Sequence, residues 1–194
     1  MLEQLIQEWP VPVRELVVAG HSMGGLVARS ACHYAEIARY AWPRRLNTLA
    51  FLGTPHHGAP LERAGSWVDL LASMSPYTAP LARLGTIRSA GIKDLRYGTL
   101  VDGNGNRKAA ARTPVPLPAH TDCYAIAATT QHSGGPGRLS GDGLVSVRSA
   151  LGHHDNPAAS LSLPSAHQRI VHGLNHFDLL SNREVYDQLH RWLA

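Results

Sequence analysis

The chain has few cysteines, few charged residues and no long apolar run, and each shortage excludes a class of protein. Its two cysteines, Cys32 and Cys123, are spaced for neither a zinc site nor a redox pair, so we expect two buried free thiols. No apolar run reaches the roughly 18 residues of a membrane span, and the N-terminus lacks the basic and apolar regions of a signal peptide. The sequence therefore predicts no transmembrane segment and a cytoplasmic protein.

Charge is too sparse and too scattered to indicate a nucleic-acid partner. Charged residues make up 16% of the 194-residue chain, and the formal net charge is +4. The basic residues are mostly arginines without a continuous block, which argues against binding to nucleic acid. Hydrophobic residues make up 44% of the chain, which is enough for the core of one globular domain of this length.

The stretch around Ser22, by contrast, carries a specific pattern. An apolar run at residues 16–19 leads directly into G-H-S-M-G at residues 20–24, and a helical pattern follows. A G-x-S-x-G motif between a strand and a helix is the context in which its serine acts as a nucleophile; a chance motif would leave Ser22 as a helix N-cap. Such a sharp turn predicts a strained backbone at Ser22 and space for nothing larger than glycine at Gly20 and Gly24.

Strand and helix patterns alternate along the chain, which predicts a parallel α/β sheet with helices on both faces. The expected strands are residues 16–19, 49–52, 123–128 and 168–172, and the expected helices are residues 1–9, 23–41 and 181–194. On the second helix the expected buried stripe is Val27, Ala31, Tyr34, Ala38 and Ala41. Ser181 and Glu184 have the spacing of a capping box at the start of the last helix.

Residues 59–120 interrupt this alternation, because they are too many for a connection between a strand and a helix. Short helical patterns broken by prolines are followed there by a stretch rich in Gly, Asn and Pro. We interpret this insertion as a cap or lid on a single domain. Its residues Trp67, Leu71 and Met74 are candidates for lining an apolar pocket, although packing of the cap onto the core would explain them equally well.

A serine nucleophile needs a base and an orienting acid, and position selects the candidates among twelve histidines and several acids. His176 follows the last predicted strand on a loop, where a strand end can aim its ring at Ser22. Asp142 lies in G-D-G on the loop after the third predicted strand, where a carboxylate can approach an imidazole closely; an ordinary turn aspartate is the alternative. Asp178 is the second candidate acid, although its place two residues after His176 favours a role in bracing that loop.

Four segments together resemble the α/β-hydrolase family, especially its bacterial lipase-like and esterase-like members. They are GHSMGG (20–25), FLGTPHHGAP (51–60), SGDGLVSVRSALG (140–152) and GLNHFDLL (173–180), in the family's order. The resemblance implies a three-layer α/β-hydrolase fold, of which this chain carries the C-terminal portion with about four strands and a cap insertion. It also implies a triad of Ser22, Asp142 and His176, an oxyanion donor at the backbone N–H of Met23, no cofactor and no metal.

The resulting hypothesis is a serine-dependent carboxylic ester hydrolase, lipase-like or esterase-like, that acts on a small-molecule or lipid ester. His21 beside the nucleophile, and His56 and His57 after the second predicted strand, are further candidates for the substrate pocket. The same triad also serves thioesterases, amidases and acyltransferases, and a non-catalytic remnant would keep the same pattern.

The N-terminal strands of the resembled family, which carry its second oxyanion donor, have no counterpart in this chain. We therefore expect an N-terminally truncated domain in which residues 16–19 form an exposed strand edge. Such an edge is a template for pairing with another chain, so self-association is possible there. Loss of one oxyanion donor lowers a rate by about a hundredfold to a thousandfold, so we expect poor activity from the chain alone.

Overall fold

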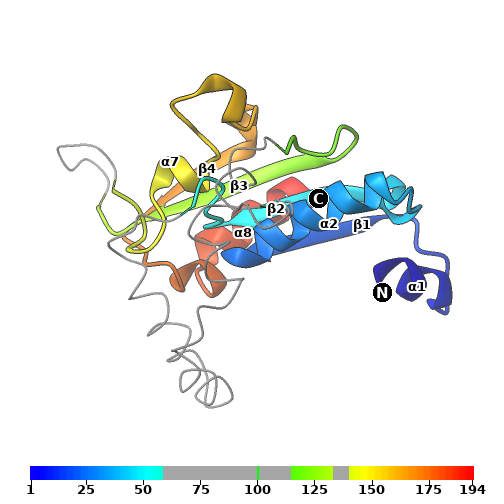
Figure 1. Cartoon of the computed structure of the whole chain (residues 1–194). Coiled ribbons are helices and arrows are strands. Elements are labelled where there is room, and N and C mark those ends of the chain that lie inside the picture. The colour runs from blue at the N-terminus through cyan, green and yellow to red at the C-terminus, as the bar shows by residue number, and fades with distance from the viewer. Residues whose placement is uncertain (59–99, 101–114, 133–139) are drawn as a thin grey trace, which may run out of the picture.

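The computed structural model describes residues 1–58, 100, 115–132 and 140–194, and its centre is a parallel sheet. The strands lie side by side in chain order: β1 (Leu16–His21), β2 (Leu46–Leu52), β3 (Asp122–Thr129) and β4 (Gln168–His172) (Figure 1). All four predicted strands are confirmed, although the first three continue beyond their predicted ends. The predicted parallel α/β fold is therefore correct.

Helices cover the sheet and connect its strands (Figure 1). Within the described residues, the α-helices are α1 (Leu2–Glu8), α2 (Met23–Ile37), α7 (Val147–Ala150) and α8 (Arg183–Leu193). Short 3-10 helices lie at η1 (Trp42–Arg45), η3 (Pro157–Ala159), η4 (Ser165–His167) and η5 (Asp178–Leu180). The predicted insertion at residues 59–120 falls largely outside the described residues.

Two apolar clusters on opposite faces of the sheet produce the three layers. Successive side chains of a strand point to opposite faces, so Phe51 and its neighbour Leu52 belong to different clusters. Phe51 and Ala125 pack in the cluster that includes Cys32 of α2, whereas Leu52 packs in the cluster that includes Val185 of α8. Both cysteines are free and buried, as predicted.

The buried face of α2 differs from the predicted one. Its buried residues are Gly25, Leu26, Arg29, Cys32 and Ala35. Val27 and Tyr34 of the predicted stripe are instead 60% and 42% exposed, so that prediction was wrong. The prediction used the spacing of apolar residues alone, and the buried face of α2 includes Arg29, which is charged.

The start of α8 also differs from the prediction. Asn182, not Ser181, is the N-cap, and its side-chain oxygen accepts hydrogen bonds from the N–H groups of Glu184 and Val185 at 2.8 and 3.4 Å. The capping box was therefore wrong by one residue, and the helix begins two residues later than predicted. Asn is as good an N-cap as Ser, so the local sequence contained both candidates.

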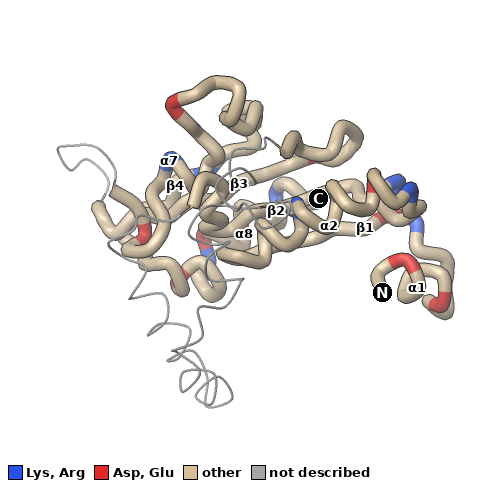
Figure 2. The backbone as a smooth tube through the Cα atoms, viewed as in Figure 1, with Lys and Arg blue, Asp and Glu red and all other residues tan. Residues whose placement is uncertain are grey.

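Within the described part of the chain, β1 is an edge strand that pairs only with β2. The side chain of Val17 on this strand is 46% exposed. The predicted strand edge is thus present in the described residues. Figure 2 shows a group of basic residues beside the end of α2 and others elsewhere on the described fold. Arg44 and Arg45 lie in η1, which follows α2.

Candidate active site

Ser22 lies in the sharp turn between β1 and α2, as its motif predicts. Its backbone angles are φ 56° and ψ −126°, a strained conformation for a residue with a Cβ. The backbone N–H of Ser22 donates to the carbonyl oxygen of Leu52 at 2.8 Å, which fixes the turn to the end of β2. Backbone strain that neighbouring structure holds in place is typical of residues at functional sites.

The glycines of the turn are required for space at two positions, one of which differs from the prediction. A Cβ at Gly20 would lie 2.6 Å from the backbone nitrogen of Gly25, so glycine is needed there. A Cβ at Gly24 would meet no atom within 4 Å, which contradicts the predicted crowding. The crowded position is Gly25, where a Cβ would lie 2.7 Å from Cγ2 of Thr54.

Asp142 and His176 form a buried pair. Nδ1 of His176 lies 2.7 Å from Oδ2 of Asp142, and each residue is 2% exposed. The other carboxylate oxygen, Oδ1, accepts the N–H groups of Leu144 and Val145 at 2.9 and 2.8 Å. In the tautomer that carries its proton on Nδ1, His176 donates to Asp142 and Nε2 is the acceptor nitrogen of the ring.

The loop that carries Asp142 depends on a glycine. Gly141 has φ +123°, and a Cβ there would collide with the carbonyl oxygen of Val145. The backbone is also tied to the histidine loop, since the N–H of His176 donates to the carbonyl oxygen of Asp142 at 3.1 Å. Side chain and backbone therefore both hold these two loops together.

The serine turn and the imidazole meet at the carboxyl end of β2. Ser22 is hydrogen-bonded to Leu52, and the next residue, Gly53, lies against the ring of His176. A Cβ on Gly53 would be 3.1 Å from Cε1 of that ring. Met23 begins α2 at the same end, and the positive end of a helix dipole attracts negative charge. The carboxyl ends of parallel strands are the usual place for a site in such a sheet.

His21 is directed at the histidine loop. Its Nε2 lies 3.0 Å from the carbonyl oxygen of His176, and the two ring centroids are 4.6 Å apart. Burial lowers the pKa of His21, and the hydrogen bond to that carbonyl works in the opposite direction. The neutral form therefore dominates at neutral pH, with the proton on Nε2.

His56 is buried between residues of α2 and α7. Its side chain is 3% exposed, and Nδ1 lies 3.2 Å from Nη1 of Arg29, which also donates to the carbonyl oxygen of Val115. Burial, followed by the neighbouring Arg29 cation, lowers the pKa of His56 well below its usual value. Burial likewise lowers the pKa of Arg29 to about 10. His57 is half-buried, and its ring centroid lies 4.8 Å from that of His154.

Arg29 and Ser149 connect the segment that carries His56 and His57 to the helices on either side of it, α2 and α7. Neither residue was identified from the sequence. The carbonyl oxygen of Ser149 accepts the N–H of His56 at 3.3 Å, and its Oγ accepts the N–H of His57 at 3.2 Å. Ser149 lies on α7, which follows the Asp142 loop, and Arg29 lies on α2, which follows Ser22. The burial of Arg29 could have been inferred from its spacing, because it is three residues from both Leu26 and Cys32 on the same helix.

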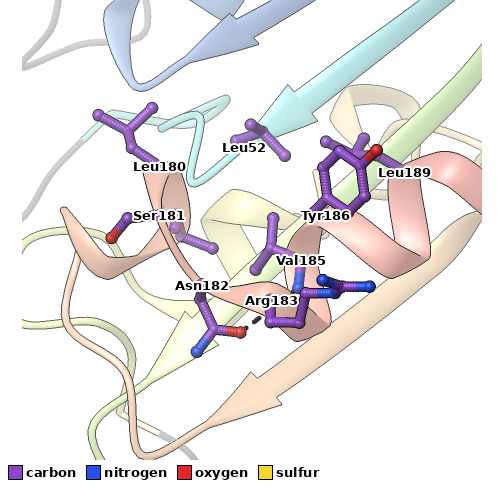
Figure 3. A pocket seen from close by; sticks show the side chains of 9 residues that line it. Leu52, Leu180, Ser181, Asn182, Arg183, Val185, Tyr186 and Leu189 are labelled. Carbon is purple, nitrogen blue, oxygen red and sulfur yellow. Dashed lines mark hydrogen bonds between the residues drawn. The ribbon is translucent and has the colours of Figure 1, made fainter.

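An open cavity of about 540 Å³ adjoins the histidine loop (Figure 3). Apolar and polar side chains both line it; the lining residues are Leu52, Leu179, Leu180, Ser181, Asn182, Arg183, Val185, Tyr186 and Leu189. None of the six residues predicted for the pocket is among them. Trp67, Leu71 and Met74 lie outside the described residues, so their role stays a prediction.

The described residues include no group of three or more His, Cys, Asp or Glu side chains that could hold a metal ion. Asp178, the second candidate acid, accepts the N–H of Asn175 at 2.8 Å through Oδ2, and so braces the histidine loop as expected. Within the described ranges, the helices are too short or too polar to cross a membrane.

Comparison with known proteins identifies the family. Among solved structures, the mature form of Bacillus licheniformis lipase BlEst2 has a TM-score of 0.53 at 19% identity, covering 100% of this chain and 70% of that chain. Its propeptide form has a TM-score of 0.52 at 18% identity, covering 97% of this chain and 38% of that chain. These likenesses show the α/β-hydrolase fold. No curated protein matches the chain.

The family model of the PGAP1-like alpha/beta domain matches residues 2–105. The match includes the serine turn, α2 and β2, and it extends over more than half of the sequence. The predicted resemblance to α/β hydrolases is thereby confirmed for family and fold. The chain belongs to the PGAP1-like alpha/beta domain family, which is of the α/β-hydrolase type.

Proposed function

We propose that the chain is a serine-dependent hydrolase of carboxylic esters that works through an acyl-enzyme at Ser22. The observation that carries the proposal is the buried 2.7 Å hydrogen bond between His176 and Asp142, at the sheet end where Ser22 occupies its strained turn. A weak hydroxyl nucleophile needs such a paired base. A small-molecule or lipid ester is the proposed substrate.

Each side chain has one task in this proposal. Nε2 of His176 accepts the hydroxyl proton of Ser22 as Oγ attacks the ester carbonyl carbon, and Asp142 stabilises the imidazolium that results. The N–H of Met23 donates to the developing oxyanion. The bond to the alcohol then breaks, and the alcohol leaves with the proton from His176. Water attacks the acyl-enzyme by the same route and releases the carboxylic acid and free Ser22.

Thioesters, amides and transfer of the acyl group to another acceptor would use the same residues, and a non-catalytic remnant would keep them without using them. A matched panel of p-nitrophenyl esters, thioesters and anilides separates these alternatives. We expect turnover of the esters to be fastest and to require Ser22, so that Ser22→Ala abolishes it. The control is Ser162→Ala, which changes an exposed serine outside the G-x-S-x-G motif. Faster turnover of thioesters or anilides would favour another acyl-transfer activity.

The insertion at residues 59–120 enters the proposal as the part that selects the acyl chain. Its apolar residues Trp67, Leu71 and Met74 remain proposed pocket residues, together with His21, His56 and His57. Removal of the insertion should therefore change the preference among esters of different chain length. The same preference with and without it would contradict this part of the proposal.

We also propose that the chain associates with a second copy of itself through β1. The edge position of β1 and the 46% exposed side chain of Val17 support this, because an open apolar strand is a template for strand pairing.

A further inference from the structure

The backbone of His176 is held at both of its polar groups by different partners. Its N–H donates to the carbonyl oxygen of Asp142 at 3.1 Å, and its carbonyl oxygen lies 3.0 Å from Nε2 of His21. The first contact joins the histidine to the acid loop. The second joins it to the residue directly before Ser22, at the end of β1.

These two contacts have different consequences for the site. The Asp142 contacts hold acid and base together as one unit, through both the side chain and the backbone. That unit would keep its internal geometry even if it moved relative to the nucleophile. The hydrogen bond from His21 ties the backbone of His176 to the strand end that carries Ser22.

We propose that His21 is a positioning residue: by donating from Nε2 to the backbone carbonyl of His176, it sets the distance between the imidazole base and Ser22. This inference rests on the proposed function for its catalytic consequence, but the hydrogen bond itself can be tested without activity. A displacement of about 1 Å in such a pair can cost a hundredfold in rate, so one well-placed donor has a large effect.

The chemistry of a histidine suits this task. Packing against the ring of His176, at 4.6 Å between centroids, restricts the His21 ring and so directs its N–H. Two titratable groups act on His21, namely His176 and Asp142, and Phe177 is the uncharged ring beside it at 6.2 Å. A neutral His21 supplies the donor without placing a positive charge beside the base that must become an imidazolium during attack.

Two substitutions separate the donor from the ring. His21→Phe keeps an aromatic ring but removes the N–H, and His21→Gln supplies a side-chain N–H without the ring. The matched control is His167→Phe, because Nδ1 of His167 contacts the carbonyl oxygen of Cys123 at 3.1 Å and its ring packs on Tyr124 at 4.3 Å. This control removes the same kind of contact from a place outside the proposed site.

Three quantities are measured on each variant of the 194-residue chain: ester turnover, the rate at which a fluorophosphonate labels Ser22, and the NMR signal of the His176–Asp142 proton. For His21→Phe we expect kcat and the labelling rate to fall by between about tenfold and a hundredfold with KM unchanged, while the downfield Nδ1 proton of His176 persists. His21→Gln should recover most of the loss, and His167→Phe should match the original chain. Unchanged kcat and labelling in His21→Phe would overturn the inference, as would an equal loss in His167→Phe or a loss of the downfield proton.

If the original chain neither labels at Ser22 nor hydrolyses esters, the proposed function fails and the positioning contact is judged by NMR alone. The carbonyl ¹³C resonance of His176 should then shift in His21→Phe and stay close to its original place in His21→Gln. An unchanged resonance in His21→Phe would overturn the contact.

Discussion

Gly25 of α2 lies against Thr54 of the loop after β2, with no space for a side chain between them. A Cβ at position 25 would be 2.7 Å from Cγ2 of Thr54 and 2.9 Å from Cδ1 of Phe51. The first helical turn after the nucleophile is thereby packed directly on the loop that leads from the carboxyl end of β2. The G-x-S-x-G motif by itself predicts the tight contact at Gly24 instead.

We expect Gly25→Ala to destabilise the fold by about 1–3 kcal/mol, because a methyl group must displace Thr54 or the helix. Gly24→Ala is the control, since a Cβ there meets nothing within 4 Å. It should be neutral or stabilising by about 0.5–1 kcal/mol, as alanine loses less entropy than glycine in a helix. Urea unfolding of both variants checks this, and equal effects of the two substitutions would contradict it.

Asp142→Asn should lower kcat/KM for ester hydrolysis by on the order of 10⁴ if Asp142 orients His176 as proposed. The amide cannot stabilise an imidazolium, and it favours the wrong tautomer of the ring. Asp187→Asn is the control, because that carboxylate pairs with Arg183 on the exposed surface of α8 and such pairs contribute little. If Asp142→Asn keeps its activity, Asp142 is not the acid of the triad, and Asp178 becomes the candidate.

Stability should fall as the pH drops below about 6.5, since His56 is buried in its neutral form with a lowered pKa. The unfolded chain binds a proton at pH values where folded His56 does not, so acid favours unfolding. His21 and His57, whose pKa values are also lowered, act in the same direction. Each group contributes at most about 1.4 kcal/mol per pH unit.

The contribution of His56 is measured by urea unfolding at about pH 7.5 and pH 5 in the original chain, His56→Gln and His153→Gln. His56→Gln keeps an acceptor for Arg29 and should lose less stability between the two pH values. His153→Gln changes an exposed histidine and should follow the original chain. The same acid loss in His56→Gln as in the original chain would show that His56 is not the group responsible.

Val17→Lys should shift the chain toward the monomer if β1 is the surface of association. A lysine on an edge strand opposes strand pairing by its charge and its hydration. Val27→Lys is the matched control, because Val27 is also an exposed valine but lies on α2. Sedimentation velocity of the three proteins distinguishes them. A monomeric original chain, or equal association in all three, would contradict the proposed role of the edge.

The strands and their parallel order were predictable because apolar runs bounded by glycine or proline specify buried strands with little help from tertiary contacts. The pairing of Asp142 with His176 was predictable because the two residues follow β3 and β4, which are neighbouring parallel strands whose carboxyl ends lie together. The family resemblance, in four segments at the right order, was specific enough to identify the fold.

Features set by tertiary packing were not predictable in this way. The face of α2 depends on Arg29, whose burial requires partners from Val115 and His56 that are distant in sequence. The N-cap of α8 was misplaced because Ser181 and Asn182 have similar capping propensity. The direction of His21 depends on where the chain after β4 places the carbonyl of His176.

The central claim is that Ser22 is an activated nucleophile, and labelling with a fluorophosphonate followed by peptide mapping tests it most directly. The account predicts one modified peptide, containing Ser22, with labelling abolished in Ser22→Ala, strongly slowed in His176→Asn and unchanged in Ser162→Ala. No labelling of the folded original chain, or labelling that persists in Ser22→Ala, would contradict it.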